Sequence, residues 1–138
     1  MQDSTKVLLG ATRSSFKVID NRAGTIPAGT AVRLKSDGTI SVASADGNLL
    51  GVSVGADLGY AGRTAICRMG LDVPILLTAA FTPVVGAQVN ISNTTGLAGA
   101  AGAGFTAVNA VYKSAVLTGV KEDATEADCA LIDFQGGL

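Results

Sequence analysis

Apolar and polar residues alternate along much of this chain with a period of two, which is typical of short β-strands with one buried face. The clearest example lies in the first third of the sequence. Val32 and Leu34 occupy one face of the predicted strand, and Arg33 and Lys35 occupy the other. We therefore expect the apolar pair to be buried and the basic pair to face solvent.

Asp37-Gly38 interrupts this alternation, and such a pair favours a tight turn with positive φ. Residues 31–43 are therefore predicted to form a β-hairpin. Further strands are expected at 15–20, 49–54, 63–69, 72–77, 87–92, 106–111, 114–120 and 128–134. No stretch long enough for a helix carries an apolar stripe free of glycine. The pattern predicts an all-β fold, a small antiparallel β-barrel or β-sandwich that is jelly-roll-like.

An internal repeat organises these strands. Residues 27–38 are similar to residues 83–96, because each segment begins with proline, continues through a glycine turn and enters a strand. A chain of 138 residues suits one domain. We predict a single domain, 1–138, built from two similar β-modules at 24–80 and 81–138, preceded by an N-terminal arm, 1–23. Deletion of residues 1–20 is expected to leave a folded protein that attaches more weakly to its partner surface.

Two segments have a composition that predicts exposed loops. Residues 97–104 consist of one leucine followed only by glycines and alanines, whose side chains are too small to pack a core. Residues 121–128 contain the one dense acidic cluster. We interpret this cluster as a solvated turn, because its spacing does not follow that of a calcium-binding loop.

The composition excludes several kinds of chemistry. The chain contains no histidine, so Ser-His-Asp and Cys-His catalysis and histidine-ligated zinc are ruled out. The glycine-rich segment 97–104 lacks the Lys-Ser/Thr that completes a phosphate-binding loop. We therefore expect no enzyme activity, no cofactor and no metal site.

Charge and hydropathy narrow the range of partners. Charged residues make up only 15% of the chain, and the net charge is −1. Residues 1–70 carry 8 basic and 5 acidic side chains (+3), whereas residues 71–138 carry 2 and 6 (−4). Nucleic acid is not an expected partner, and this polarity favours head-to-tail association or a charged protein surface. Residues 73–81, the most apolar stretch, are too short to cross a membrane.

No signal peptide is evident, so we expect synthesis in the cytosol. Cys67 and Cys129 are accordingly predicted to be reduced core residues.

Basic and apolar residues of the arm and the first hairpin are the candidate contact residues. Two interpretations of the arm remain open, a simple edge strand or a strand that adds to the sheet of another chain. For Arg33 and Lys35 the alternatives are an ordinary wet sheet face or a patch that meets an acidic partner. The candidate residues for contact with a partner or a second subunit are Lys6, Leu8, Arg13, Phe16, Lys17, Arg22, Arg33 and Lys35.

Three segments carry a resemblance to a known family. Residues 26–40 read Ile-Pro-Ala-Gly-Thr-Ala-Val-Arg-Leu-Lys-Ser-Asp-Gly-Thr-Ile, and the Leu-Gly-Val strand at 50–54 and residues 63–70 follow. A second Gly-x-x-Val lies at 86–89. This pattern resembles the capsid decoration, or cement, proteins of tailed bacteriophages, in which the strand-and-turn unit tends to recur. The resemblance covers about residues 24–138, and the arm is longer than is usual in that family.

The resemblance implies a structural virion protein without enzyme activity. Such a protein binds the outer surface of an expanded capsid as dimers or trimers and stabilises contacts between major capsid subunits. It is made in the cytoplasm of the bacterial host. Two alternatives stay open: a tail, baseplate or receptor-binding β-module, and a small hydrolase that uses only carboxylates.

Overall fold

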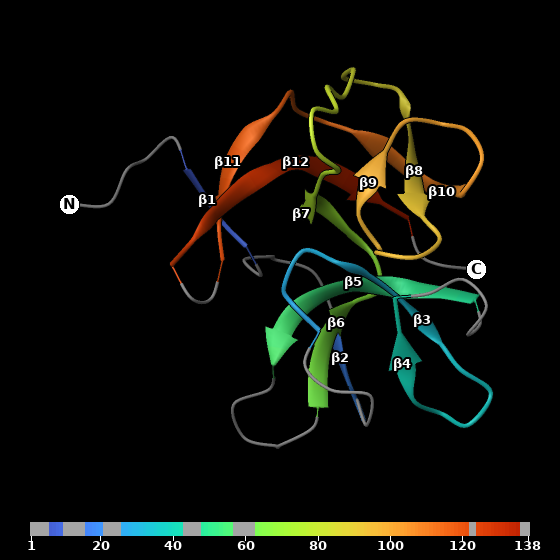
Figure 1. Ribbon diagram of the computed structural model, residues 1–138. Helices are drawn as coiled ribbons and strands as arrows, with labels where there is room; N and C mark the ends of the chain where they lie inside the picture. Colours follow the sequence, from blue (N-terminus) through green and yellow to red (C-terminus); the bar gives the residue numbers. More distant parts are fainter. Residues whose placement is uncertain are drawn as a thin grey trace.

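The computed structural model describes residues 6–9, 16–20, 26–42, 48–56, 63–121 and 124–135. Within these ranges, β-strands form two sheets that lie one above the other in Figure 1. The seven-stranded sheet contains β1 (Lys6–Leu8), β7 (Gly70–Leu76), β8 (Gln88–Ser92), β9 (Ala98–Gly99), β10 (Phe105–Tyr112), β11 (Leu117–Val120) and β12 (Glu126–Phe134). The five-stranded sheet contains β2 (Phe16–Asp20), β3 (Ala31–Leu34), β4 (Ile40–Ser41), β5 (Asn48–Ala56) and β6 (Arg63–Cys67). The all-β prediction is confirmed, and the sheets form an open, sandwich-like arrangement.

The two sheets repeat one strand order. In the five-stranded sheet the order is β2-β6-β5-β3-β4. In the seven-stranded sheet β7 pairs with β12, and β10, β8 and β9 follow on the other side. Strand β11 continues β10 along the same edge of β12. Strand β1 has no counterpart in the five-stranded sheet, and it pairs with β11 in the parallel direction.

The backbone hydrogen bonds at the start of each unit are repeated as well. The Gly29 amide donates to the Ser53 carbonyl at 2.8 Å, and the Gly86 amide donates to the Tyr112 carbonyl at 2.8 Å. In both units the amide of the acceptor residue donates back to the residue after the glycine. The two sheets are therefore built on the same local geometry, as the repeated glycine motif in the sequence suggests.

Strands β2 and β7 occupy the same place, because each lies beside the last strand of its unit. The repeated units therefore run over 16–67 and 70–134, and differ from the modules expected at 24–80 and 81–138. Neither strand carries the proline-glycine motif that reveals the repeat, so β2 was placed in the arm and β7 in the first module.

The largest apolar core is shared by the two sheets. The five-stranded sheet contributes Ala31, Val52 and Cys67, and most of the remaining side chains come from β7, β8, β10 and β12. A second cluster contains Ile26, Val32, Ile40 and Ile66. Because successive residues of a strand point to opposite faces, Ala31 and Val32 show that β3 is buried on both faces. Cys67 and Cys129 are buried thiols that form no disulfide among the described residues, as predicted.

The predicted burial of Val32 is confirmed, but the predictions for Arg33 and Leu34 are wrong. Arg33 is only 5% exposed, whereas Leu34 is 41% exposed and Lys35 is half-buried. The register between β3 and β5 also shifts after Val32. Alternation in a strand predicts one solvent-facing side only when nothing packs on that side. In β3 the face that carries Ala31 packs against the seven-stranded sheet.

The predicted hairpin is present. Strands β3 and β4 pair across the turn, and the Gly38 amide donates to the Lys35 carbonyl at 3.1 Å. The Asp37 carboxylate accepts a hydrogen bond from the Thr39 amide at 3.0 Å, which closes the turn further. The second predicted turn, Asp46-Gly47, lies outside the described residues.

The loop predicted at 97–104 is only partly a loop. Ala98 and Gly99 form β9 and are buried. A side chain on Gly99 would place its Cβ 2.7 Å from the Phe105 ring and 2.7 Å from Thr78 Oγ1. The small residues therefore permit close packing at this position, and the interpretation of 97–104 as an exposed loop was wrong for β9.

Candidate functional site: the intersheet groove

The predicted contact residues are divided between the two sheets. Lys6 lies on β1 of the seven-stranded sheet, where its ammonium forms an ion pair with Glu126 of β12. The remaining candidates inside the described ranges lie elsewhere: Leu8 on β1, Phe16 and Lys17 on β2, Arg33 on β3, and Lys35 directly after β3. Arg13 and Arg22 lie outside the described residues. The described candidates therefore do not form one basic patch.

Arg33 is a buried cation. Its Nη2 atom has no hydrogen-bond partner among the described residues. Burial in a poorly solvated environment lowers the pKa of the guanidinium. The prediction that Arg33 reaches a partner surface is wrong for this conformation, because 95% of the residue is covered by its own chain.

The arm strands pair within their own chain. Strand β2 pairs with β6 over five residues, and β1 adds to β11, with the Leu9 amide donating to the Val120 carbonyl at 3.1 Å. Leu9 is 5% exposed and belongs to an apolar cluster with Ala28, Leu76 and Cys129. This arrangement corresponds to the edge-strand interpretation. Deletion of residues 1–20 would remove β1 and β2, so the expectation that the shortened chain still folds remains a prediction.

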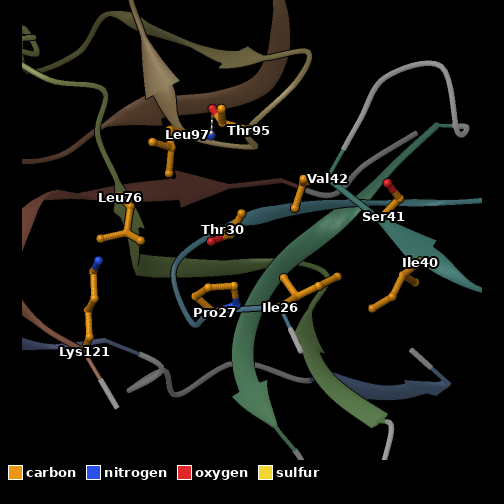
Figure 2. Close-up of a pocket in the computed structure, with 10 residues that line it drawn as sticks. All are labelled: Ile26, Pro27, Thr30, Ile40, Ser41, Val42, Leu76, Thr95, Leu97 and Lys121. Atoms are coloured by element: carbon orange, nitrogen blue, oxygen red, sulfur yellow. Dashed lines mark hydrogen bonds between the residues drawn. The ribbon is translucent and has the colours of Figure 1, made fainter. Parts of the chain in front are cut away.

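A groove of about 430 Å³ lies where the two sheets meet, and Figure 2 shows the side chains around it. We name it the intersheet groove. Its lining comes from the segments before and after β3, from the end of β7, from the β8–β9 turn and from the residue that follows β11. The lining residues are Ile26, Pro27, Thr30, Ile40, Ser41, Val42, Leu76, Thr95, Leu97 and Lys121.

Two backbone hydrogen bonds between the sheets position this lining. The Leu76 amide of β7 donates to the Gly29 carbonyl at 2.8 Å, and the Ala31 amide of β3 donates to the Gly96 carbonyl at 2.9 Å. The first bond fixes Leu76 beside the turn that enters β3. The second fixes the β8–β9 turn, and with it Leu97, against the same region. The groove is therefore formed by the fold itself.

The groove is apolar with one charged side chain. Six of its ten lining residues carry aliphatic side chains, and the others are three hydroxyl residues and Lys121. The Thr95 hydroxyl accepts a hydrogen bond from the Leu97 amide at 3.4 Å. This lining offers no pair of acid and base groups, so its chemistry is that of recognition, with apolar contact along the groove and a positive charge at one end (Figure 2).

Sequence reasoning missed this groove because its residues lie in turns and strand ends far apart in the chain. The nearest signal was Lys121, which begins the cluster interpreted as an acidic turn. The chain turns here, since the Lys121 amide donates to the Thr125 carbonyl at 2.8 Å. However, Glu126 and Asp128 lie in β12, so the predicted turn at 121–128 was too long. Because the neighbouring residues are acidic, nothing in the sequence indicates that Lys121 lines a groove.

Several large apolar side chains are exposed away from the groove. Met69 and Leu71, in and after the β6–β7 turn, are 60% and 71% exposed, and they border a second hollow of about 440 Å³. Val84 and Val85, in the segment before β8, are 68% and 60% exposed. Exposed apolar groups of this size favour contact with another protein surface.

The described residues contain no group of three or more Cys, Asp or Glu side chains placed to hold a metal ion. Nor does the described part of the chain include a helix of the length and apolarity that a membrane crossing requires. Comparison of the chain with protein-family models, with curated proteins and with solved structures finds no match.

Proposed function

We propose that this protein is a capsid decoration protein, a structural component of a phage virion without enzyme activity. It binds the outer surface of the expanded capsid and stabilises contacts between major capsid subunits. Its partners are the major capsid protein and further copies of itself, as dimers or trimers. It is made in the cytoplasm of the bacterial host and functions on the exterior of the capsid.

The duplicated strand unit is the observation that supports this proposal. The resemblance to decoration proteins rests on a strand-and-turn unit that recurs after a second Gly-x-x-Val. In the structure the two glycine turns, at Gly29 and Gly86, make equivalent hydrogen bonds within two sheets of the same strand order. The recurrence is therefore a property of the fold as well as of the sequence.

The surface is also suited to burial against a shell. The chain has few charges, and Met69, Leu71, Val84 and Val85 expose apolar side chains. Each such contact is modest, but a capsid offers many identical sites. When linked copies bind neighbouring subunits at once, the second contact becomes intramolecular and the overall affinity rises.

Mixing the purified protein with capsids tests the proposal. Expanded and unexpanded capsids of the phage that encodes the protein are incubated with it, pelleted and imaged by cryo-electron microscopy. We expect saturable binding and added density at fixed positions on the outside of expanded capsids, with unexpanded capsids as the control. Expanded capsids that stay bare at a saturating protein concentration would exclude the function.

A further inference from the structure

The floor of the intersheet groove is a preformed apolar surface. Leu76 and Ile26 are 6% and 7% exposed and Val42 and Leu97 are half-buried, so these side chains offer its accessible apolar surface, whereas Ile40 is fully buried. The hydrogen bond between Leu76 and Gly29 fixes two sides of this floor relative to each other. A site whose shape exists before binding loses little conformational entropy when it is occupied.

The rim of the groove is open. Pro27 and Thr95 are exposed, while Val42, Leu97 and Lys121 are half-buried. A small ligand is held well when most of its surface is enclosed, typically about 70–90%. An open trough with a buried floor instead suits a side chain that projects from a partner protein, because the partner's own surface then covers the rim.

Lys121 gives the groove its charge preference. It is the one charged side chain in the lining, and its ammonium has no hydrogen-bond or ion-pair partner among the described residues. Figure 2 shows Lys121 at one end of the groove, with Ile40 and Val42 toward the other end. An apolar group lying along the floor would therefore place its neighbouring charged group beside the ammonium, where a carboxylate is favoured.

We propose that the intersheet groove receives an anchor from the major capsid protein, consisting of an apolar side chain next to an Asp or Glu carboxylate. The apolar side chain lies against Leu76 and the half-buried Val42 and Leu97, and the carboxylate pairs with Lys121. This inference rests on the proposed decoration function and gives that function a defined contact site. The site differs from the set expected from sequence, in which Arg33 is now buried and Lys6 is paired.

Matched charge variants test the role of Lys121. Lys121→Gln and Lys113→Gln each remove one positive charge, but Lys113 does not line the groove and instead pairs with Asp133 at 3.3 Å. We expect Lys121→Gln to weaken binding to expanded capsids about tenfold, as loss of a charge-assisted hydrogen bond does. Lys113→Gln should bind within about twofold of the unmodified protein.

A second pair of variants tests the apolar floor without removing a charge. Thr95→Trp places a bulky ring on the rim and should block entry, reducing capsid binding at least tenfold. Thr94→Trp is the control, because Thr94 is also exposed and is adjacent but does not line the groove. Thermal unfolding of all four variants confirms that each is compared in its folded state.

The results of these experiments distinguish failure of the proposed groove contact from failure of the proposed decoration function. If the unmodified protein binds capsids and Lys121→Gln and Thr95→Trp bind as well as their controls, the groove is not the contact site, although the function stands. If the unmodified protein does not bind, the decoration function fails, and this inference fails with it. Thermal stabilisation by decanoate that depends on Lys121, with unchanged capsid binding by Lys121→Gln, would assign the groove to a small amphiphile and overturn the proposal.

Discussion

The packing of the β8–β9 turn against β3 can be tested with two equivalent glycines. Gly38 and Gly96 each directly precede the residue that closes the turn of their unit, since the Lys35 amide donates to the Thr39 carbonyl and the Ser92 amide donates to the Leu97 carbonyl, both at 2.8 Å. Their φ angles are 86° and 73°, in the left-handed region. Replacement by alanine should cost about 1–2 kcal/mol at either position, because a Cβ is disfavoured there.

The surroundings of the two glycines differ sharply. A Cβ at Gly38 has no atom within 4 Å, whereas a Cβ at Gly96 would lie 2.5 Å from the Ala31 carbonyl oxygen and 2.7 Å from Thr30 Cγ2. The turn must then move away from β3, which breaks the 2.9 Å bond from the Ala31 amide to the Gly96 carbonyl. Leaving a buried amide unpaired costs about 1–3 kcal/mol. Gly96→Ala should therefore lose about 2 kcal/mol more than Gly38→Ala.

Urea denaturation followed by circular dichroism measures this difference. With a slope of about 2 kcal/mol/M, the midpoint of Gly96→Ala should lie about 1 M below that of Gly38→Ala. Gly38→Ala serves as the matched control, because it carries the same backbone penalty without the contact. Equal midpoints for the two variants would refute the close packing of the turn on β3, and with it the preformed side of the groove.

Three further predictions concern the buried core. Leu9→Ala should lower the free energy of unfolding by about 2–3 kcal/mol in urea denaturation, because Leu9 is 5% exposed; a loss below about 0.5 kcal/mol would show that β1 is not docked. Tyr112 has a buried hydroxyl without a hydrogen-bond partner among the described residues, so Tyr112→Phe should change stability by less than about 1 kcal/mol, and a larger loss would reveal a partner. Burial, aided by the Asp128 carboxylate, raises the pKa of Cys129 from 9.0 to about 11, so its contribution to stability is complete below pH 9 and is lost as pH rises to about 11. Cys129→Ala should therefore flatten the pH profile of the denaturation midpoint over that interval, and an unchanged slope would contradict the thiol's burial.

Local strand and turn chemistry was predictable from the sequence. The Asp37-Gly38 pair predicted the β3–β4 hairpin, because its turn geometry depends only on adjacent residues. The two glycine turns predicted the repeat for the same reason. The boundaries of the repeat were not predictable in this way, since the places of β2 and β7 depend on pairing with strands about 50 residues away.

Burial and the candidate site depended on how the sheets meet. The alternation in its own strand predicts that Arg33 faces solvent, but the folded chain leaves it only 5% exposed. Lys121 stands in an acidic segment that gives no local sign of an apolar groove. Its role follows from the backbone bonds that bring Gly29 to Leu76 and Ala31 to Gly96, which no local pattern records.

The position of β12 has a consequence for how the protein is made. This last strand lies inside the seven-stranded sheet, with β7 on one side and β10 and β11 on the other. The sheet cannot be completed until the ribosome has synthesised β12, and β1 must pair with β11, which lies far from it in the sequence. Such long-range pairing makes folding slow compared with helical proteins of similar length. The newly made chain therefore exposes its apolar strands for a time, and exposed strands of this kind favour aggregation until the sheet is complete.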